Sequence, residues 1–183
     1  IFSIKIKLYR NQPLEIPINA YIMENSLKKN LMTQMLEHVP DLGWTWDALY
    51  KAEKIAKKTK NPNREALQTL FGNKISNIIE TFNDKLDEDM YSIFNNDNKK
   101  DLGTTDTVKA LILSRLKASA NYKSIVKTSL LFMAQPRNAY DAFNQVMKTS
   151  NKIWEIAGDT SQGGAFYSKR LILSGVYSST LAY

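Results

Sequence analysis

The chain has 183 residues, about the size of one domain, and its 43% hydrophobic and 23% charged residues are ordinary for a globular fold. It contains no cysteine, which excludes disulfides, thiolate nucleophiles and cysteine-based zinc sites. Its single histidine, His38, leaves little for metal binding or for base catalysis near neutral pH. Carboxylate and Ser/Lys chemistry are not excluded. With only 7 Gly and 5 Pro, the composition favours long helices.

The chain is basic, with a formal charge of +7 and an isoelectric point near 9.4. Such an excess is compatible with nucleic acid, an anionic membrane surface or an acidic partner. The lysines are scattered among acidic residues, so a composition bias accounts for the charge equally well. The longest apolar run, residues 129–134, is far shorter than the ~20 residues that span a bilayer.

The first 22 residues differ in pattern from the rest of the chain. Ile4, Ile6 and Leu8 alternate with other residues as in a strand, and Met23 is a candidate natural start. We therefore expect residues 1–22 to form an extension outside the fold. One helical domain is expected over residues 23–183.

From Ser26 onward, apolar residues recur at helical spacing. Ser26 is the candidate N-cap of a first helix that closes at Gly43, and Thr45 is positioned to cap a second. An Asn-Pro-Asn turn at residues 61–63 opens a short third helix. A long fourth helix follows from residue 73. Further helices are expected at residues 108–120, capped by Thr104 or Thr105, at 122–134, at 137–157 with Pro136 in its first turn, and from about 165 to the end.

The first four helices follow a known order. A tight turn joins the first two, the third ends in an aromatic-Gly-x-Lys sequence at residues 71–74, and a long connecting helix comes next. This order is similar to the start of TetR-type regulators, in which three helices form a helix-turn-helix unit and later helices form a ligand pocket and a dimer surface. The resemblance implies a helix-turn-helix-like unit over residues 23–74 and a helical lipid-pocket bundle over 75–183.

The second half carries more specific motifs. Residues 154–161 read Trp-Glu-Ile-Ala-Gly-Asp-Thr-Ser, and residues 166–170 read Phe-Tyr-Ser-Lys-Arg. With His-Val-Pro at residues 38–40 and Gly-Trp-Thr at residues 43–45, the chain resembles the Coq-nine family of ubiquinone-biosynthesis proteins from about Leu31 to its end. It departs from the family at residues 163–165, where Gly-Gly-Ala replaces an acidic and an amide residue.

The resemblance implies an all-α, TetR-like, non-catalytic accessory protein without a cofactor. Its implied partners are an isoprenoid lipid or quinone intermediate, a di-iron demethoxyubiquinone hydroxylase and a second copy of the chain. A peripheral membrane surface is a further implied partner, since in the family an amphipathic membrane-binding helix follows the position of Tyr183. The expected location is the bacterial cytoplasm at the inner membrane, or the matrix side of the mitochondrial inner membrane.

Large apolar residues on the later helices are the candidate lipid contacts, and we expect them to enclose an elongated apolar cavity. They are Leu113, Leu130, Met133, Tyr140, Phe143, Met147, Trp154, Leu173 and Tyr177. The candidate partner surface consists of Asp159, Phe166, Tyr167, Lys169 and Arg170. Ordinary structural roles compete with these assignments, because Trp154 also suits a core and Asp159 suits a turn. No residue is assigned to catalysis or to a metal.

Two further groups of charged residues bear on the function. The acidic run Asp87-Glu88-Asp89 splays around a helix and is expected to form a solvated face. The basic residues between Lys51 and Arg64 favour the alternative of a TetR-type DNA-binding regulator with an apolar ligand pocket. The second-half motifs decide against that alternative, so no sequence-specific nucleic acid is expected.

Overall fold

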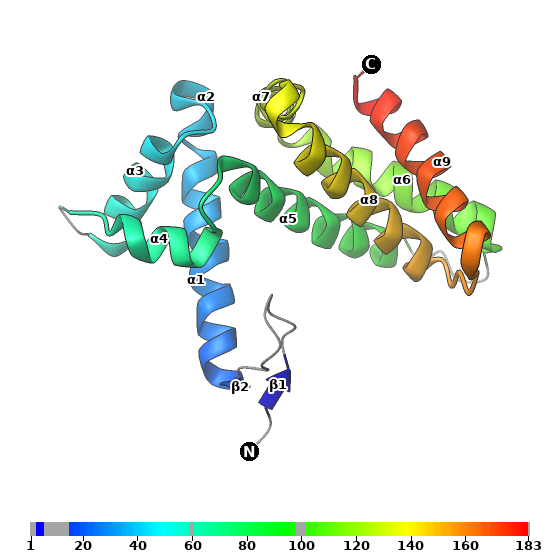
Figure 1. Ribbon diagram of the computed structural model, residues 1–183, viewed down its shortest axis with the longest axis horizontal. Coiled ribbons are helices and arrows are strands. Elements are labelled where there is room, and N and C mark those ends of the chain that lie inside the picture. The colour runs from blue at the N-terminus through cyan, green and yellow to red at the C-terminus, as the bar shows by residue number, and fades with distance from the viewer. Residues whose placement is uncertain (1–2, 6–14, 59–60, 98–101, 183) are drawn as a thin grey trace. The chain divides into compact units, whose positions relative to one another are not determined.

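The computed structural model describes residues 3–5, 15–58, 61–97 and 102–182 (Figure 1). Almost all of them are helical, which confirms the predicted all-α fold. The exception is a pair of short antiparallel strands, β1 (Ser3–Lys5) and β2 (Glu15–Pro17), in which Ile4 lies opposite Ile16. The chain divides into two compact units, residues 1–73 and residues 74–183.

The first unit holds α1 (Ile18–Leu36), α2 (Val39–Leu42), α3 (Trp46–Lys57) and α4 (Arg64–Phe71). Its α1 begins eight residues before the predicted start, so Ser26 is not an N-cap and residues 18–22 of the expected extension are helical. Residues 1–2 and 6–14 of that extension lie outside the described residues. The early start was missed because none of the described side chains before Leu31 in α1 is buried, so those turns have no buried apolar face to indicate a helix.

Capping side chains define two helix starts of the first unit. The predicted cap is confirmed at Thr45, whose hydroxyl accepts a hydrogen bond from the backbone N–H of Ala48 at 3.3 Å. The Asn63 side chain caps α4 in the same way. The core between α1, α3 and α4 is formed by Leu31, Met32, Met35, Leu36, Leu49, Ala52, Leu67 and Phe71.

The second unit is the part of the chain that bears the candidate site. It holds α5 (Ile75–Asn96), α6 (Thr104–Ala120), α7 (Lys123–Met133), the 3₁₀ turn η1 (Pro136–Asn138), α8 (Ala139–Ile156) and α9 (Gly163–Ala182). In this unit, α5 packs against α6 and α8, and α8 packs against α9 (Figure 1). Met90, Val108, Leu111, Ile153 and Leu173 meet in one core cluster.

Two predicted helix starts in the second unit require correction. The residue before α6 is Gly103, which offers no capping side chain, and Thr104 is already helical. Pro136 lies in η1 rather than in the first turn of α8, which begins at Ala139. A proline pre-sets a helical φ but lacks an N–H, so it fits a 3₁₀ turn as readily as an α-helix start.

Candidate functional site

A cavity of about 90 Å³ lies among α5, α6, α7, α8 and α9 of the second unit. Eight apolar residues line it: Ile79, Leu86, Val126, Leu130, Met133, Ala142, Val146 and Leu181. Seven polar residues complete the wall: Asn83, Arg115, Ser119, Ser129, Gln145, Thr149 and Tyr177. The cavity is small, and the surface of its wall is mostly apolar despite the seven polar residues. It is also below the ~150 Å³ of a cavity known to hold benzene.

The structure brings three of the nine candidate lipid contacts to this cavity, Leu130, Met133 and Tyr177. Three others are exposed: Leu113 at 49%, Tyr140 at 76% and Phe143 at 52%. The remaining three pack elsewhere in the unit: Met147, Trp154 and Leu173. Apolar residues at neighbouring positions of one helix point in different directions, so composition alone does not separate lining residues from exposed ones.

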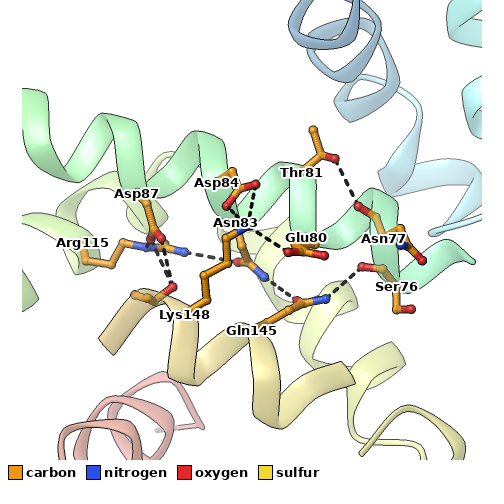
Figure 2. A network of polar contacts seen from close by, with 11 residues as sticks. Ser76, Asn77, Glu80, Thr81, Asn83, Asp84, Asp87, Arg115, Gln145 and Lys148 are labelled. Carbon is orange, nitrogen blue, oxygen red and sulfur yellow. Dashed lines mark hydrogen bonds and ion pairs between the residues drawn. The ribbon is translucent and has the colours of Figure 1, made fainter. Parts of the chain in front are cut away.

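Arg115 of the cavity wall belongs to a buried ion pair (Figure 2). Arg115 Nε on α6 donates to Asp87 Oδ1 on α5 at 2.8 Å, and each side chain is only 2% exposed. The hydroxyl of Thr149 on α8 donates to Asp87 Oδ2 at 3.1 Å. Three helices are thus joined at one carboxylate. The expectation that the acidic run forms a solvated face is therefore wrong for Asp87.

Hydrogen bonds extend this network along the groove between α5 and α8. Arg115 Nη2 donates to Asn83 Oδ1 at 3.2 Å, and Asn83 Nδ2 donates to Gln145 Oε1 at 2.8 Å. Gln145 Nε2 in turn donates to the backbone carbonyl of Ser76 at 2.9 Å, and Figure 2 shows the chain of contacts. Each side-chain amide of the network both donates and accepts, which is the condition for a stable buried polar chain.

Electrostatics at the wall are set by burial and by the opposite charge. Burial raises the pKa of the Asp87 carboxyl, while the adjacent Arg115 guanidinium opposes that shift. Burial also raises the pKa of Tyr177, whose ring faces the Arg115 guanidinium at 5.8 Å, to about 12. The Tyr177 hydroxyl therefore keeps its proton at neutral pH.

Sequence reasoning missed Asp87, Arg115 and Asn83 as parts of a site. The sequence nevertheless contains a pattern that indicates their burial. Arg115 interrupts an apolar run of α6, and Asp87 directly follows Leu86 on the buried face of α5. A charged residue at an apolar position of a helix indicates a buried partner, but not which helix supplies it.

The candidate partner residues cluster where α8 turns into α9. Lys169 Nζ and Arg170 Nη1 donate to the two carboxylate oxygens of Asp159 at 2.7 and 3.1 Å. The Arg170 guanidinium also lies 3.4 Å from the centre of the Phe166 ring. Hydrogen bonds from Lys169, Ser161 and Arg170 to the Asp159 carboxylate hold its pKa well below its usual range.

This arrangement corrects one expectation about the partner surface. Arg170 is only 2% exposed and Asp159 is buried against it, so neither lies on a shared surface with Tyr167. Tyr167 itself is 63% exposed. Arg170 and Tyr167 are three positions apart on α9, which suggested a shared face. The Arg170 side chain instead points towards α8, where its Nε donates a hydrogen bond to Asn151 Oδ1 at 2.7 Å.

Trp154 joins the same cluster rather than the cavity. Its indole Nε1 donates to the backbone carbonyl of Lys169 at 3.2 Å, and the Lys169 ammonium lies 5.2 Å from the centre of its ring. This contact ties the end of α8 to α9.

Among the described residues, no group of three or more His, Cys, Asp or Glu side chains is arranged to hold a metal ion. Within the same residues, none of the helices is long and apolar enough to cross a membrane.

Comparison with known proteins points to one family. The COQ9 family model matches residues 139–183, which span α8 and α9. The ubiquinone biosynthesis protein COQ9, mitochondrial, of Xenopus tropicalis is 25% identical over 169 residues, covering 88% of this chain and 51% of the relative. The protein of the same name from Rattus norvegicus is 25% identical over 168 residues, covering 87% of this chain and 52% of the relative. That from Homo sapiens is 24% identical over 168 residues, covering 87% of this chain and 51% of the relative.

The chain spans about half the length of the curated relatives that it matches. The family model covers the two helices that carry the Trp-Glu-Ile-Ala-Gly-Asp and Phe-Tyr-Ser-Lys-Arg motifs, and the relatives align over most of the chain. These matches confirm the resemblance that the sequence indicated: the chain is similar to the COQ9 family of ubiquinone-biosynthesis proteins.

Proposed function

We propose that this chain serves ubiquinone biosynthesis as a non-catalytic accessory protein that binds an isoprenoid lipid or quinone intermediate. One observation carries the proposal: the cavity lies against the helices that the COQ9 family model covers. Six lining residues come from α8 and α9: Ala142, Gln145, Val146, Thr149, Tyr177 and Leu181. The names of the curated relatives support the pathway.

The cavity offers both surfaces that a quinone lipid needs. Its apolar wall removes hydrocarbon from water, at about 0.8 kcal/mol for each buried CH₂. Leu130 lines the cavity and is also 36% exposed, so it separates the cavity from the surface. Met133 beside it is unbranched and adaptable. A lipid larger than the present volume would enter by displacing these two side chains.

Mass spectrometry of lipids that co-purify with the protein, without detergent, tests this function. We expect an isoprenoid quinone or its precursor in the wild-type protein and its loss from Ala142→Phe, which places a large side chain in the cavity wall. Ala139→Phe is the matched control, because Ala139 lies one turn earlier on α8, is exposed and does not line the cavity. Absence of any lipid from the wild type and from the control would refute the proposal.

The second part of the proposal is presentation of the lipid to a di-iron demethoxyubiquinone hydroxylase. Tyr167 supports a contact surface on α9, since this large aromatic side chain is 63% exposed, and exposed aromatics are frequent interface anchors. Truncation of Tyr167 to Ala should weaken hydroxylase binding by roughly 30-fold, the effect of about 2 kcal/mol. Tyr91→Ala is the control, because Tyr91 is 48% exposed on α5. Equal binding by both variants would place the partner surface elsewhere.

We further propose that the chain pairs with a second copy and works at the mitochondrial inner membrane. Leu171, Ile172 and Val176 are each at least 50% exposed on α9, and an apolar helix face of this kind supports self-association. The mitochondrial names of the relatives support the location. Sedimentation of wild type and Ile172→Glu tests the pairing, with a monomeric variant as the expected result. An unchanged sedimentation coefficient would argue against this face.

The alternative of a DNA-binding regulator is not favoured by the comparisons, because the relatives described above bear the name of a ubiquinone-biosynthesis protein.

A further inference from the structure

The second unit contains a long stretch of chain without acidic residues. Residues 107–140 include no Asp or Glu and six basic residues: Lys109, Arg115, Lys117, Lys123, Lys127 and Arg137. Two of these charges are matched, Arg115 by Asp87 and Lys117 by Asp97. The other four side chains are exposed, and none of them forms an ion pair with another described residue. The surface around α7 therefore carries positive charge that the protein itself does not neutralise.

The exposed side of α7 combines two of these lysines with apolar side chains. Lys123, Lys127, Leu130 and Leu131 recur at helical spacing, so they share one side of the helix, which we call the α7 face. Leu131 is 64% exposed and Leu130 is 36% exposed. The opposite side of α7 is buried and consists of Ile125, Ser129 and Met133. The α7 face is thus both basic and apolar.

Basic and apolar side chains on one helix face match the surface of an anionic bilayer. Leucine side chains enter the boundary between headgroups and acyl chains, and lysine stems lie along the hydrocarbon while their ammonium groups stay among the headgroups. Anionic phospholipids attract the ammonium groups. An acidic protein surface would also pair with Lys123 and Lys127, but it would offer carboxylates rather than hydrocarbon to the leucines beside them. The combination therefore favours a membrane.

The α7 face lies beside the cavity of the second unit. Leu130 lines the cavity and is also part of the exposed face, so a single side chain belongs to both. A lipid that enters past Leu130 from a bilayer passes between two apolar surroundings. Entry from water would first expose its hydrocarbon, at a cost of about fourfold in the equilibrium constant for each CH₂. The position of the α7 face therefore suits uptake of a lipid directly from a membrane.

We infer that the α7 face is a contact surface for a bilayer that contains anionic phospholipids. The inference rests on the proposed function, since a protein that takes a lipid from a membrane has to reach that membrane. It names the surface that makes the contact. This surface differs from the α9 residues proposed for self-association and from the helix that the family resemblance places after Tyr183.

Sedimentation with vesicles of phosphatidylcholine, with and without phosphatidylglycerol, tests the inference. We expect the protein to bind the vesicles that contain phosphatidylglycerol, and to bind them less tightly as salt is added. The double variant Lys123→Gln, Lys127→Gln should weaken this binding roughly 25-fold, about fivefold for each lysine at an anionic surface. Leu131→Gln should weaken it about fivefold, because the leucine no longer buries hydrocarbon in the bilayer.

Exposed residues of α3 provide matched controls. The double variant Lys51→Gln, Lys54→Gln removes the same charge, and Ile55→Gln removes an apolar side chain that is 50% exposed. Both should leave vesicle binding nearly unchanged. Equal weakening by the α3 and α7 variants would overturn the inference, because binding would then depend on net charge alone.

Two other results would also overturn the inference: equally tight binding with and without phosphatidylglycerol, or no binding to either vesicle. In each of these cases the lipids that co-purify with the protein still decide the proposed function. If no lipid co-purifies but the α7 variants lose vesicle binding as expected, the proposed function fails while the α7 face remains a membrane contact.

Discussion

Truncation of Asp87 to Ala is expected to lower the free energy of unfolding by about 3–5 kcal/mol, the usual loss when one partner of a buried ion pair is removed. The structure explains the size of this loss. The Arg115 side chain is 2% exposed, so its charge would stay out of water with only Ser119 and Asn83 as hydrogen-bond acceptors. Thr149 would lose the acceptor of its hydroxyl as well. Since small domains are stable by about 5–15 kcal/mol, this is a large fraction of the total.

Urea unfolding followed by circular dichroism measures the loss, and the same acidic run provides the control. Asp89 pairs with Lys85 one turn away at 2.7 Å, but both side chains are partly exposed, so Asp89→Ala should cost only about 0.3–0.5 kcal/mol. The double variant Asp87→Leu, Arg115→Met removes both charges and should regain at least about 2 kcal/mol of the single variant's loss. Equal midpoints for Asp87→Ala and Asp89→Ala would refute the reasoning.

Three further predictions concern pH and capping. The pKa of Tyr177 rises from 10.0 to about 12 on folding, so the folded state keeps its proton longer and loses stability as pH rises through that interval. One pH unit above the ordinary Tyr pKa, wild type should have lost about 1.4 kcal/mol more than Tyr177→Phe, measured by urea unfolding; parallel pH curves would contradict this. The lowered pKa of Asp159 stabilises the folded state at pH values above the ordinary pKa of 3.8, and this stabilisation is lost as the pH falls. The melting temperature of wild type should therefore exceed that of Asp159→Asn by less in acid than at neutral pH. A difference in melting temperature that does not change with pH would contradict this prediction. Thr45→Ala should cost about 1 kcal/mol by loss of the α3 cap, and an unchanged unfolding midpoint would show that the cap is not needed.

Local sequence patterns determined much of this protein. The helical spacing of apolar residues predicted nearly every helix, because a helix buries one face whatever its neighbours are. Thr45 could be recognised as a helix cap from the sequence, because its hydroxyl bonds to a backbone N–H only three residues further along the chain. The motifs of residues 154–170 indicated the family, and the match over residues 139–183 covers them.

Tertiary structure alone decided where the polar wall lies and which side chains reach the cavity. Asp87 and Arg115 are 28 positions apart, and their pairing follows from the packing of α5 on α6, which no local pattern encodes. Arg170 looked like a surface residue because helix spacing cannot tell a side chain bonded to a neighbouring helix from one facing solvent. A charged side chain can be buried only when another helix supplies its counter-ion. Which helix does so depends on how all the helices pack, and the local sequence does not contain that information.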